Sequence, residues 1–448
     1  MRISAVILAA GQGTRMRSSL PKVLHPLLGR PMLFYSLEAA RQVTDTTPVL
    51  VIGHGGDQVQ QTIGEAALYA LQEPQLGTAH ALMQAEPLLH GQADLVLLTA
   101  ADMPLVTPET LRRLVQTQMA HAGPITLLSA RVDTTSDFGR VLRGPDGRVQ
   151  AVVEVAQATP EQLAVSEVNA SIYCFAAEWL WDALRRIPLS PKGEYYLTEA
   201  IGLAVAEGLS VQALTVEDNL ETLGINTRIQ LAEAEATLRQ RINRGWMLNG
   251  VTIVDPATTY IEPGVRIGVD TTIWPNTFLQ GNTEVGENCV LGPNAILRNA
   301  RLGNGCKVLA SVLEGAVLED KVDVGPFGHL RKGAYLAEGV HMGNFGEVKD
   351  SYVGPGTKLG HFSYIGNATI GPRVNIGAGT VTCNYDGEKK NPTEIGAGAF
   401  IGSDTMLVAP IKVGEGARTG AGAVVTKDVP PDTLAVGMPA RRIRKLRK

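Results

Sequence analysis

Two glycines and two cations that follow the first apolar run of the sequence suggest a site for phosphate groups. Gly11 and Gly13 come directly after the run at 3–10, Arg15 lies in the same turn, and Lys22 follows shortly after. Closely spaced glycines let backbone N–H groups approach an anion, and the two cations add fixed positive charge. Taken alone, these residues fit an ordinary strand-to-helix turn equally well.

The spacing of this turn excludes two common phosphate-binding motifs. A P-loop needs a lysine and then a serine or threonine after its last glycine, whereas Gly13 is followed by Thr14 and Arg15. A dinucleotide fingerprint needs a third glycine three residues after the second, and Met16 stands there. The rest of the chain therefore has to decide which phosphate chemistry the turn serves.

Length and composition predict a globular protein of two or three domains. The chain has 448 residues, of which 44% are hydrophobic, and its net charge of −4 gives no indication of a nucleic-acid surface. No apolar stretch approaches the roughly 20 residues that span a bilayer, so we expect no membrane partner. The basic run at 441–448 predicts a solvated, mobile end, with anion binding as the less favoured alternative.

Cysteine usage predicts a cytoplasmic protein. The cysteines lack the paired spacing of a metal site, and they fit buried or inert thiols in a reducing compartment. They are Cys174, Cys289, Cys306 and Cys383.

The first half of the chain alternates apolar runs with amphipathic segments. The stretches 49–53 and 93–102 predict strands, and 108–120 predicts a helix. Such a pattern is typical of an α/β domain with a mostly parallel sheet, whose ligands bind at the carboxyl ends of the strands. Asp102 and the glycine turn both follow predicted strands, so both are candidates for a site at that edge.

From about residue 250 an apolar residue recurs at every sixth position, which predicts a parallel β-helix. The first series is Ile261, Ile267, Ile273, Leu279, Val285, Leu291 and Leu297. The second series is Val312, Leu318, Val324, Leu330, Leu336, Met342 and Val348. After a slip follow Val353, Leu359, Ile365, Ile395, Ile401, Leu407 and Val413. Gly268, Gly286, Gly377 and Gly402 follow apolar residues, and we expect positive φ angles at these corners.

The two halves are joined by a stretch that predicts a helix, and the second half carries one long insertion. The stretch 226–246 is rich in Ala, Glu, Gln, Leu and Arg, so we expect domains at 1–226 and 248–448 with a connecting helix at 227–247. The longest break in the repeat is the polar segment 383–394, which predicts a protruding loop with a binding role.

Several motifs together resemble those of one bacterial enzyme family. LAAGQGTRM at 8–16 and QLGTAH at 75–80 are similar to motifs of the sugar-phosphate nucleotidyltransferases. Joined to GHFSYIGNATIG at 360–371 and NIGAGTVTCNYDG at 375–387, they resemble the bifunctional N-acetylglucosamine-1-phosphate uridyltransferases and glucosamine-1-phosphate N-acetyltransferases. The resemblance runs from residue 3 to about 437. It implies a Rossmann-like α/β domain joined by a long helix to a left-handed β-helix of hexapeptide repeats.

The resemblance also implies the reactions. Acetyl-CoA would acetylate glucosamine 1-phosphate, and UTP would then uridylylate the product with release of pyrophosphate. The UDP-N-acetylglucosamine formed would supply peptidoglycan and lipopolysaccharide synthesis. The family further implies Mg²⁺ and a homotrimer, with acetyl sites built where subunits meet.

In the first domain the resemblance implies one set of ligand-binding residues. Those lining the nucleotide would be Leu8, Ala9, Ala10 and Gly11, with Gln72, Gly77 and Thr78 at the uracil. Arg15 and Lys22 would neutralise the phosphates that leave as pyrophosphate. The N-acetylglucosamine moiety would be held by Gly139, Glu154 and Asn169, and Mg²⁺ by Asp102 and Asn226. This chain has Ala100-Ala101 where other members have Tyr-Gly.

In the second domain the resemblance assigns His361 as the general base for acetyl transfer. The sugar phosphate would be bound by Arg331, Lys349, Tyr364, Asn375 and Lys390. Acetyl-CoA would be contacted by Ala378, Asn384, Tyr385, Ser403 and Ala421. Met438 stands where the family often has an arginine.

Two other classes of protein compete with the two-reaction enzyme. One is a nucleotidyltransferase whose β-helix serves only as an oligomerisation scaffold, and the other is a non-catalytic regulatory subunit. Arg15, Lys22 and Asp102 argue against the regulatory subunit. His361 and the loop at 383–394 argue against the scaffold, because oligomerisation needs neither.

Overall fold

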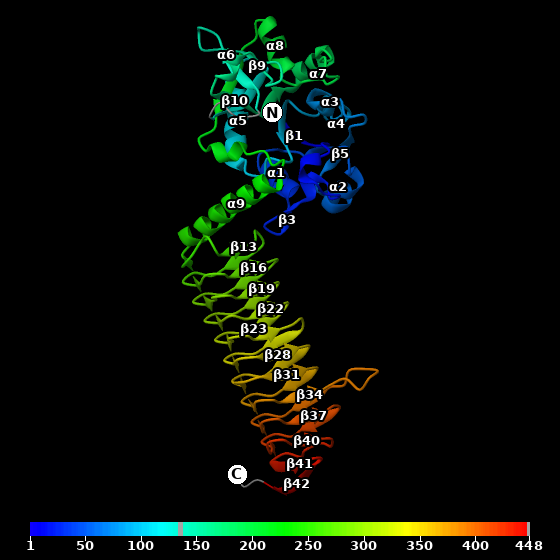
Figure 1. Ribbon diagram of the computed structural model, residues 1–448, viewed down its shortest axis with the longest axis vertical. Helices are drawn as coiled ribbons and strands as arrows, with labels where there is room; N and C mark the ends of the chain where they lie inside the picture. Colours follow the sequence, from blue (N-terminus) through cyan, green and yellow to red (C-terminus); the bar gives the residue numbers. More distant parts are fainter. Residues whose placement is uncertain (133–137, 446–448) are drawn as a thin grey trace. The chain divides into compact units, whose positions relative to one another are not determined.

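The computed structural model of the chain describes residues 1–132 and 138–445. The chain divides into two compact units, Met1–Thr237 and Leu238–Lys448, and the division lies within helix α9 (Arg228–Leu248) (Figure 1). Helix α9 covers the residues where the sequence predicts a helix, and the expected domain boundaries at 226 and 247 stay predictions. Among the helices of the described ranges, none combines the length and the apolar character that crossing a membrane requires.

The first unit is built around a mostly parallel sheet, as the alternating pattern predicts. Its main strands are β1 (Ile3–Ala9), β4 (Val49–Ile52), β5 (Leu68–Leu71), β6 (Leu95–Ala100), β7 (Ile125–Arg131), β10 (Glu167–Ala176) and β11 (Val211–Thr215). They lie in the order β11-β7-β10-β6-β1-β4-β5. Only β10 is antiparallel to its neighbours on this path, β6 and β7. The hairpin of β8 (Arg140–Arg143) and β9 (Val149–Val153) adds to β10.

Strands β1 and β6 bring the two candidate sequence features to one edge of this sheet. They are parallel neighbours, and Leu8 is paired with Ala100. The glycine turn follows β1 and Asp102 follows β6, so both lie at the carboxyl ends of adjacent strands. Helix α5 (Pro108–Ala120) follows this edge, and its first turn is capped by the Thr107 hydroxyl, which accepts from the backbone N–H of Thr110.

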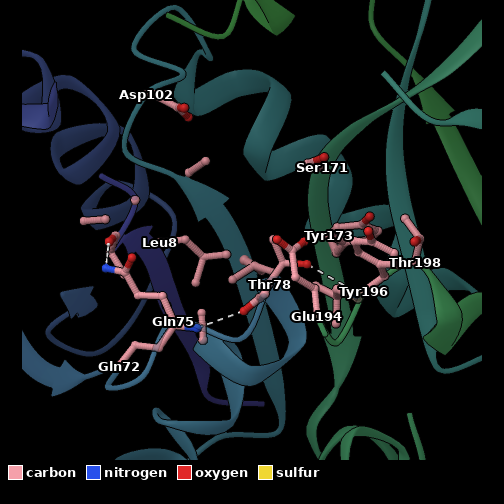
Figure 2. A pocket seen from close by; sticks show the side chains of 18 of the residues that line it. Leu8, Gln72, Gln75, Thr78, Asp102, Ser171, Tyr173, Glu194, Tyr196 and Thr198 are labelled. Atoms are coloured by element: carbon pink, nitrogen blue, oxygen red, sulfur yellow. Dashed lines mark hydrogen bonds between the residues drawn. The ribbon is translucent and has the colours of Figure 1, made fainter. Parts of the chain in front are cut away.

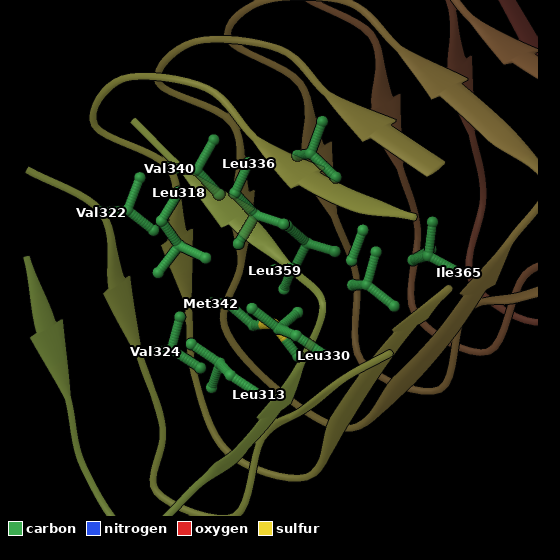
Figure 3. Packing of buried hydrophobic residues seen from close by; sticks show 14 of the residues in the cluster. Leu313, Leu318, Val322, Val324, Leu330, Leu336, Val340, Met342, Leu359 and Ile365 are labelled. Atoms are coloured by element: carbon green, nitrogen blue, oxygen red, sulfur yellow. The ribbon is translucent and has the colours of Figure 1, made fainter. Parts of the chain in front are cut away.

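The second unit is a left-handed parallel β-helix, in which each coil contributes one short strand to each of three sheets. The sheets begin with β12 (Thr252–Ile253), β13 (Tyr260–Ile261) and β14 (Arg266–Ile267). Each continues through every third strand, except that the first sheet ends with two neighbouring strands near the C-terminal end. The predicted apolar ladder fills the interior, and Figure 3 shows Leu318, Val324 and Leu330 among its buried members. The six-residue repeat therefore gives the fold of this unit.

The predicted ladder is wrong at one residue, which does not point inward. Val312 lies half-buried on the outer face of β22 (Val312–Glu314), whereas its neighbour Leu313 is fully buried. The inward residues of this region are Leu297, Leu302, Val308 and Leu313. Two of these steps are five residues long, because the coils turn more tightly here, so a strict spacing of six moves the prediction to the wrong face.

The expected reason for the corner glycines is also wrong. Positive φ angles occur at other glycines of the β-helix but not at Gly268, Gly286, Gly377 or Gly402. A Cβ on Gly268 would lie 2.6 Å from the carbonyl carbon of Gly286, and a Cβ on Gly377 would lie 2.5 Å from the backbone nitrogen of Ser403. Glycine is needed at these corners because successive coils approach each other too closely for a side chain.

The basic end of the chain is ordered by strand pairing, against the expectation of a mobile tail. Strand β42 (Ala440–Lys445) runs antiparallel to β41 (Thr433–Gly437) and ends the stack of coils. Its side chains are mostly exposed, as the charge pattern predicts. The last part of the basic run, 446–448, lies outside the described residues.

Candidate active sites

A cavity of about 540 Å³ opens at the carboxyl ends of β1 and β6 (Figure 2). Ten of the residues singled out by the resemblance line it. They are Leu8, Ala9, Ala10, Gly11, Lys22, Gln72, Gly77, Thr78, Asp102 and Glu154. Ala100, where the resemblance leads us to expect a tyrosine, also lines this cavity.

Four other predicted residues of this unit lie around the cavity without lining it. Asn226 accepts a hydrogen bond from Lys22, and Asn169 donates one of 2.7 Å to the Tyr173 hydroxyl, which is part of the lining. The carbonyl of Gly139 accepts from the backbone N–H of Asn169. Arg15 is exposed in the short helix η1 (Thr14–Met16) beside the glycine turn.

Three predicted residues meet at the end of the cavity beside the glycine turn. The Lys22 ammonium lies 2.5 Å from a carboxylate oxygen of Asp102 and 3.0 Å from the amide oxygen of Asn226. These two oxygens therefore converge on one positive charge. In the part of the chain that the structure describes, no three His, Cys, Asp or Glu side chains gather as a metal site.

Close contacts with the backbone shape the part of the cavity lined by Gln72, Gln75 and Gly77. Gln72 donates to the carbonyl of Gly77 at 2.9 Å, and Gln75 donates to the carbonyl of Ala10 at 2.5 Å. Gly77 has a φ of +98°, and a Cβ there would lie 2.7 Å from the carbonyl oxygen of Tyr195. Glycine is required at this position because the backbone of Tyr195 packs directly against it.

The opposite end of the cavity is formed by β10 and the segment around Thr198. Glu154 accepts a hydrogen bond of 3.1 Å from the Thr198 hydroxyl, and burial raises the pKa of its carboxyl group despite that bond. Burial also raises the pKa of Tyr173, so its hydroxyl stays protonated and can donate or accept a hydrogen bond.

Sequence reasoning missed several residues that line this cavity. They are Gln75, Ser171, Tyr173, Glu194, Tyr196 and Thr198. Gln75 stands inside a quoted motif and could have been found there. The others come from 171–198, which carries no quoted motif. The antiparallel strand β10 brings Tyr173 beside β6, and backbone hydrogen bonds of Tyr195 with Leu76 and Ala79 hold the segment 194–198 against the cavity.

The second unit carries a cluster of positive side chains on the sheet that begins with β13. Arg331 follows β25 (His329–Leu330), Lys349 ends β28 (Gly346–Lys349), and Lys390 reaches them from the inserted loop. Contact with Lys390 lowers the pKa of Lys349, and the charge of Arg331 adds to this effect. Arg331 donates to Glu347 at 2.9 Å. Clustered cations of this kind favour an anion such as a phosphate.

Tyr364 and Asn384 lie beside this cluster. Tyr364, on β31 (Ser363–Gly366), is paired with Glu347, and Lys349 is paired with Gly366. A Cβ on Gly366 would lie 2.5 Å from the Tyr364 hydroxyl and 2.8 Å from the Asn384 amide nitrogen. The glycine therefore leaves a space into which both polar groups point.

The inserted loop projects from the stack between β34 (Val381–Cys383) and β35 (Thr393–Ile395), as predicted (Figure 1). Tyr385 and Lys390 form an antiparallel bridge across it. The Asp386 carboxylate accepts hydrogen bonds from the backbone of Lys389 and Glu388, and these bonds lower its pKa to about 2. Charged at neutral pH, Asp386 holds the turn that presents Tyr385.

A second row of predicted residues follows one corner of the β-helix through successive coils. His361 lies exposed at the corner before β31, and the next coils place Ala378, Ser403 and Ala421 at the same corner. Backbone hydrogen bonds join successive corners. The N–H groups of Gly379, Asp404 and Gly422 donate to the carbonyls of Phe362, Ala378 and Ser403, respectively. Asn375, on β33 (Asn375–Ile376), faces outward from the adjoining sheet.

Within one chain the cation cluster and the corner row that contains His361 lie at opposite ends of the same short strands. His361 precedes β31, whereas Lys349 and Gly366 end their strands. A ligand that touches both groups must therefore lie across the outer face of the sheet, where Glu347 and Tyr364 point.

Comparison with known families separates the two units in the same way. The family described as the MobA-like NTP transferase domain matches residues 5–194. The family described as the bacterial transferase hexapeptide (six repeats) matches residues 264–299 and 392–427.

The chain is similar over almost its whole length to bacterial proteins named bifunctional protein GlmU. The relative from Heliobacterium modesticaldum is 45% identical over 99% of this chain and 97% of its own length. The relative from Trichlorobacter lovleyi is 46% identical over 97% of this chain and 95% of its own length. The relative from Geotalea uraniireducens is 44% identical over 97% of this chain and 96% of its own length. The chain therefore belongs to the GlmU family, the bifunctional uridyltransferases and glucosamine-1-phosphate acetyltransferases that make UDP-N-acetylglucosamine.

Proposed function

We propose that each unit of this chain carries one of the two reactions and that the residues described above perform them. The observation that supports the uridyltransferase site most strongly is the convergence of Asp102 and Asn226 on one cation beside the glycine turn. For the acetyltransferase, it is the cluster of Arg331, Lys349 and Lys390 across one sheet from His361.

In the first unit a phosphate oxygen of N-acetylglucosamine 1-phosphate attacks the α-phosphorus of UTP. A new P–O bond forms, and the bond from the α-phosphorus to the bridging oxygen breaks, so pyrophosphate leaves. Arg15 and Lys22 neutralise the leaving group, and the turn at 8–11 positions the nucleotide. Gln72, Gly77 and Thr78 hold the uracil, whereas Gly139, Glu154 and Asn169 hold the sugar. Positioning and charge neutralisation supply most of the rate enhancement.

Asp102 and Asn226 fit a magnesium ion. Their oxygens already converge on the Lys22 ammonium, and a carboxylate with an amide carbonyl matches the hard ligands that Mg²⁺ prefers. When bound, the ion stabilises the negative charge that develops on the phosphates.

In the second unit His361 takes the proton from the 2-amino group of glucosamine 1-phosphate. The nitrogen attacks the thioester carbonyl of acetyl-CoA, an N–C bond forms, and the C–S bond breaks with release of the CoA thiol. Arg331, Lys349 and Lys390 clamp the sugar phosphate, with Tyr364 and Asn375 beside it. Acetyl-CoA lies along the corner row Ala378, Ser403 and Ala421 and against Asn384 and Tyr385. We place the protein in the cytoplasm, because its cysteines lack the pairing typical of an oxidising compartment.

A homotrimer is supported by the outer face of one sheet of the β-helix. The outward row on the sheet that begins with β13 is apolar on both sides of a polar middle formed by His329, Glu347 and Tyr364. Its apolar members are Phe278, Ile296, Val312, Val381, Met406 and Val424. Outward positions on the other two sheets include Arg266, Glu284, Arg301, Lys307, Asp323 and His341. A second copy of the chain on the apolar face would cover it. The same copy would bring residues to the sheet face that lies between the cation cluster and His361.

Replacing Ile296 with lysine is expected to dissociate this assembly. An unpaired ammonium at the centre of an apolar interface is costly to bury, so light scattering should give the mass of a single chain. Acetyl transfer should fall at least about tenfold if the site spans two copies, and uridylyl transfer should be unchanged. The matched control is Val317→Lys, an outward valine of β23 (Val317–Leu318) on another sheet. An Ile296→Lys protein that stays trimeric would place the contacts elsewhere.

The proposed function is tested by supplying purified protein with glucosamine 1-phosphate, acetyl-CoA, UTP and Mg²⁺ and measuring each product separately. Release of both CoA thiol and pyrophosphate is expected. Pyrophosphate release from N-acetylglucosamine 1-phosphate without any thiol release would favour the alternative, a nucleotidyltransferase with a scaffolding β-helix.

A further inference from the structure

The Lys22 ammonium lies where a metal ion would have to lie. It is 2.5 Å from an oxygen of Asp102 and 3.0 Å from the amide oxygen of Asn226, the two groups to which we assign Mg²⁺. The side chains of Lys22 and Asp102 are only 10% and 25% exposed, so solvent does little to weaken their ion pair.

The two oxygens belong to a rigid part of the fold. Asp102 follows β6, and its carbonyl accepts a 2.9 Å hydrogen bond from the backbone N–H of Ile225, the residue before Asn226. The backbone N–H of Asn226 donates to the Gln230 side chain at 2.9 Å. These bonds hold the backbones of Asp102 and Asn226 side by side, so either cation can lie between their side-chain oxygens.

The backbone and Cβ of Lys22 are also held in place. It begins the short helix η2 (Lys22–Leu24) after Pro21, and its side chain packs over Gly13. A Cβ on Gly13 would lie 2.5 Å from the Cβ of Lys22, so only glycine at position 13 lets the lysine lie here. The glycine turn thus holds the ammonium toward Asp102 as well as leaving room for the nucleotide.

We propose that Lys22 is a placeholder cation, whose ammonium occupies the divalent-metal position in the metal-free enzyme and moves to the phosphates when metal and nucleotide bind. The proposal rests on the proposed metal role of Asp102 and Asn226. Two cations cannot share these oxygens, because their charges would repel at short range. The flexible four-carbon stem of lysine lets the ammonium leave without movement of the backbone.

Coupling between metal and nucleotide follows from this competition. A metal ion alone must displace the ammonium, so its apparent affinity is lowered by the fraction of enzyme in which Lys22 holds the site. Nucleotide phosphates attract the ammonium away, and thereby favour metal binding, and the reverse holds by linkage. Lys22 would then disfavour metal binding before the nucleotide arrives.

The test is a titration with Mn²⁺ in the absence of nucleotide, with free Mn²⁺ measured by electron paramagnetic resonance in the full-length protein. Lys22→Met should bind Mn²⁺ about tenfold more tightly than the unaltered chain, while losing uridylyl transfer because the phosphates lose a cation. Gly13→Ala keeps the charge but pushes the lysine aside, and should tighten Mn²⁺ binding in the same direction. Arg17→Met is the matched control, because it removes an exposed positive charge from the same turn without touching Asp102.

The outcomes separate the placeholder from the metal site itself. Equal Mn²⁺ affinity in Lys22→Met and the unaltered chain, with binding lost in Asp102→Asn, would overturn the placeholder and keep the metal assignment. An equal gain in Arg17→Met would show a general effect of charge and also overturn it. Unchanged Mn²⁺ binding in Asp102→Asn would overturn the metal assignment and the placeholder together.

Discussion

Replacing His361 with alanine is expected to lower acetyl transfer by about two to four orders of magnitude, the usual contribution of a positioned general base. The side chain is exposed at a corner, and the inward residues on either side, Leu359 and Ile365, are buried and untouched. The β-helix should therefore stay folded and assembled. Uridylyl transfer should be unchanged, because that site lies wholly in the first unit.

The measurement is thiol release from acetyl-CoA with glucosamine 1-phosphate, beside pyrophosphate release in the same preparation. His341→Ala is the matched control, since His341 is another exposed histidine of the β-helix. It pairs with Asp323 on the sheet that begins with β12, away from the sheet that carries the cation cluster. Acetyl-CoA binding should change little in His361→Ala, because its proposed contacts lie in other coils and in the inserted loop. Acetyl transfer near the unaltered rate in an assembled His361→Ala protein would remove the general-base role.

The fold of the second unit was predictable because its repeat is local. One inward residue in each six follows from stacking short strands, so a sequence pattern alone indicates the coils. The slip at Val312 was not predictable, because tightening a corner by one residue leaves the composition unchanged and moves only the phase. The reason for Gly268 was missed because the contact that requires glycine comes from the next coil.

The fold class of the first unit was predictable from the sequence, but the order of the strands in its sheet was not. Alternating strands and helices indicate a parallel sheet, whereas the antiparallel β10 between β6 and β7 depends on long-range pairing. That strand brings Tyr173 and Ser171 to the cavity, so these residues have no local signal. The motifs located the other side of the cavity because tight backbone packing restricts residue types there, as at Gly77 against Tyr195.

The contact of Lys22 with Asp102 and Asn226 shows what sequence spacing cannot give. The three residues come from segments far apart in the chain, and the resemblance implies separate roles, a phosphate contact for the lysine and metal binding for the others. The contact between the ammonium and the two proposed metal ligands appears only when β1, β6 and the segment before α9 are folded together. Roles inferred one residue at a time do not reveal such competition.

Replacing Asp102 with alanine is expected to lower pyrophosphate release at least about a hundredfold and to leave acetyl transfer intact. Loss of the carboxylate removes the charged ligand proposed for Mg²⁺, and a bound metal is worth several kcal/mol of charge stabilisation in the transition state. Asn226→Ala should have a smaller effect, because a neutral amide contributes less than a carboxylate, and added Mg²⁺ should partly restore it.

The control for this prediction lies at the other end of the same strand. Asp94 precedes β6, where its carboxylate accepts from the backbone N–H of Arg2 at 2.6 Å, away from the cavity. Asp94→Ala should therefore keep both activities. If Asp102→Ala transferred uridylyl groups at the unaltered rate, Asp102 would be a structural partner of Lys22 alone, and Mg²⁺ would have to reach the phosphates without this carboxylate. Acetyl transfer measured in the same preparation shows that the second unit is folded, so loss of pyrophosphate release alone places the effect in the first unit.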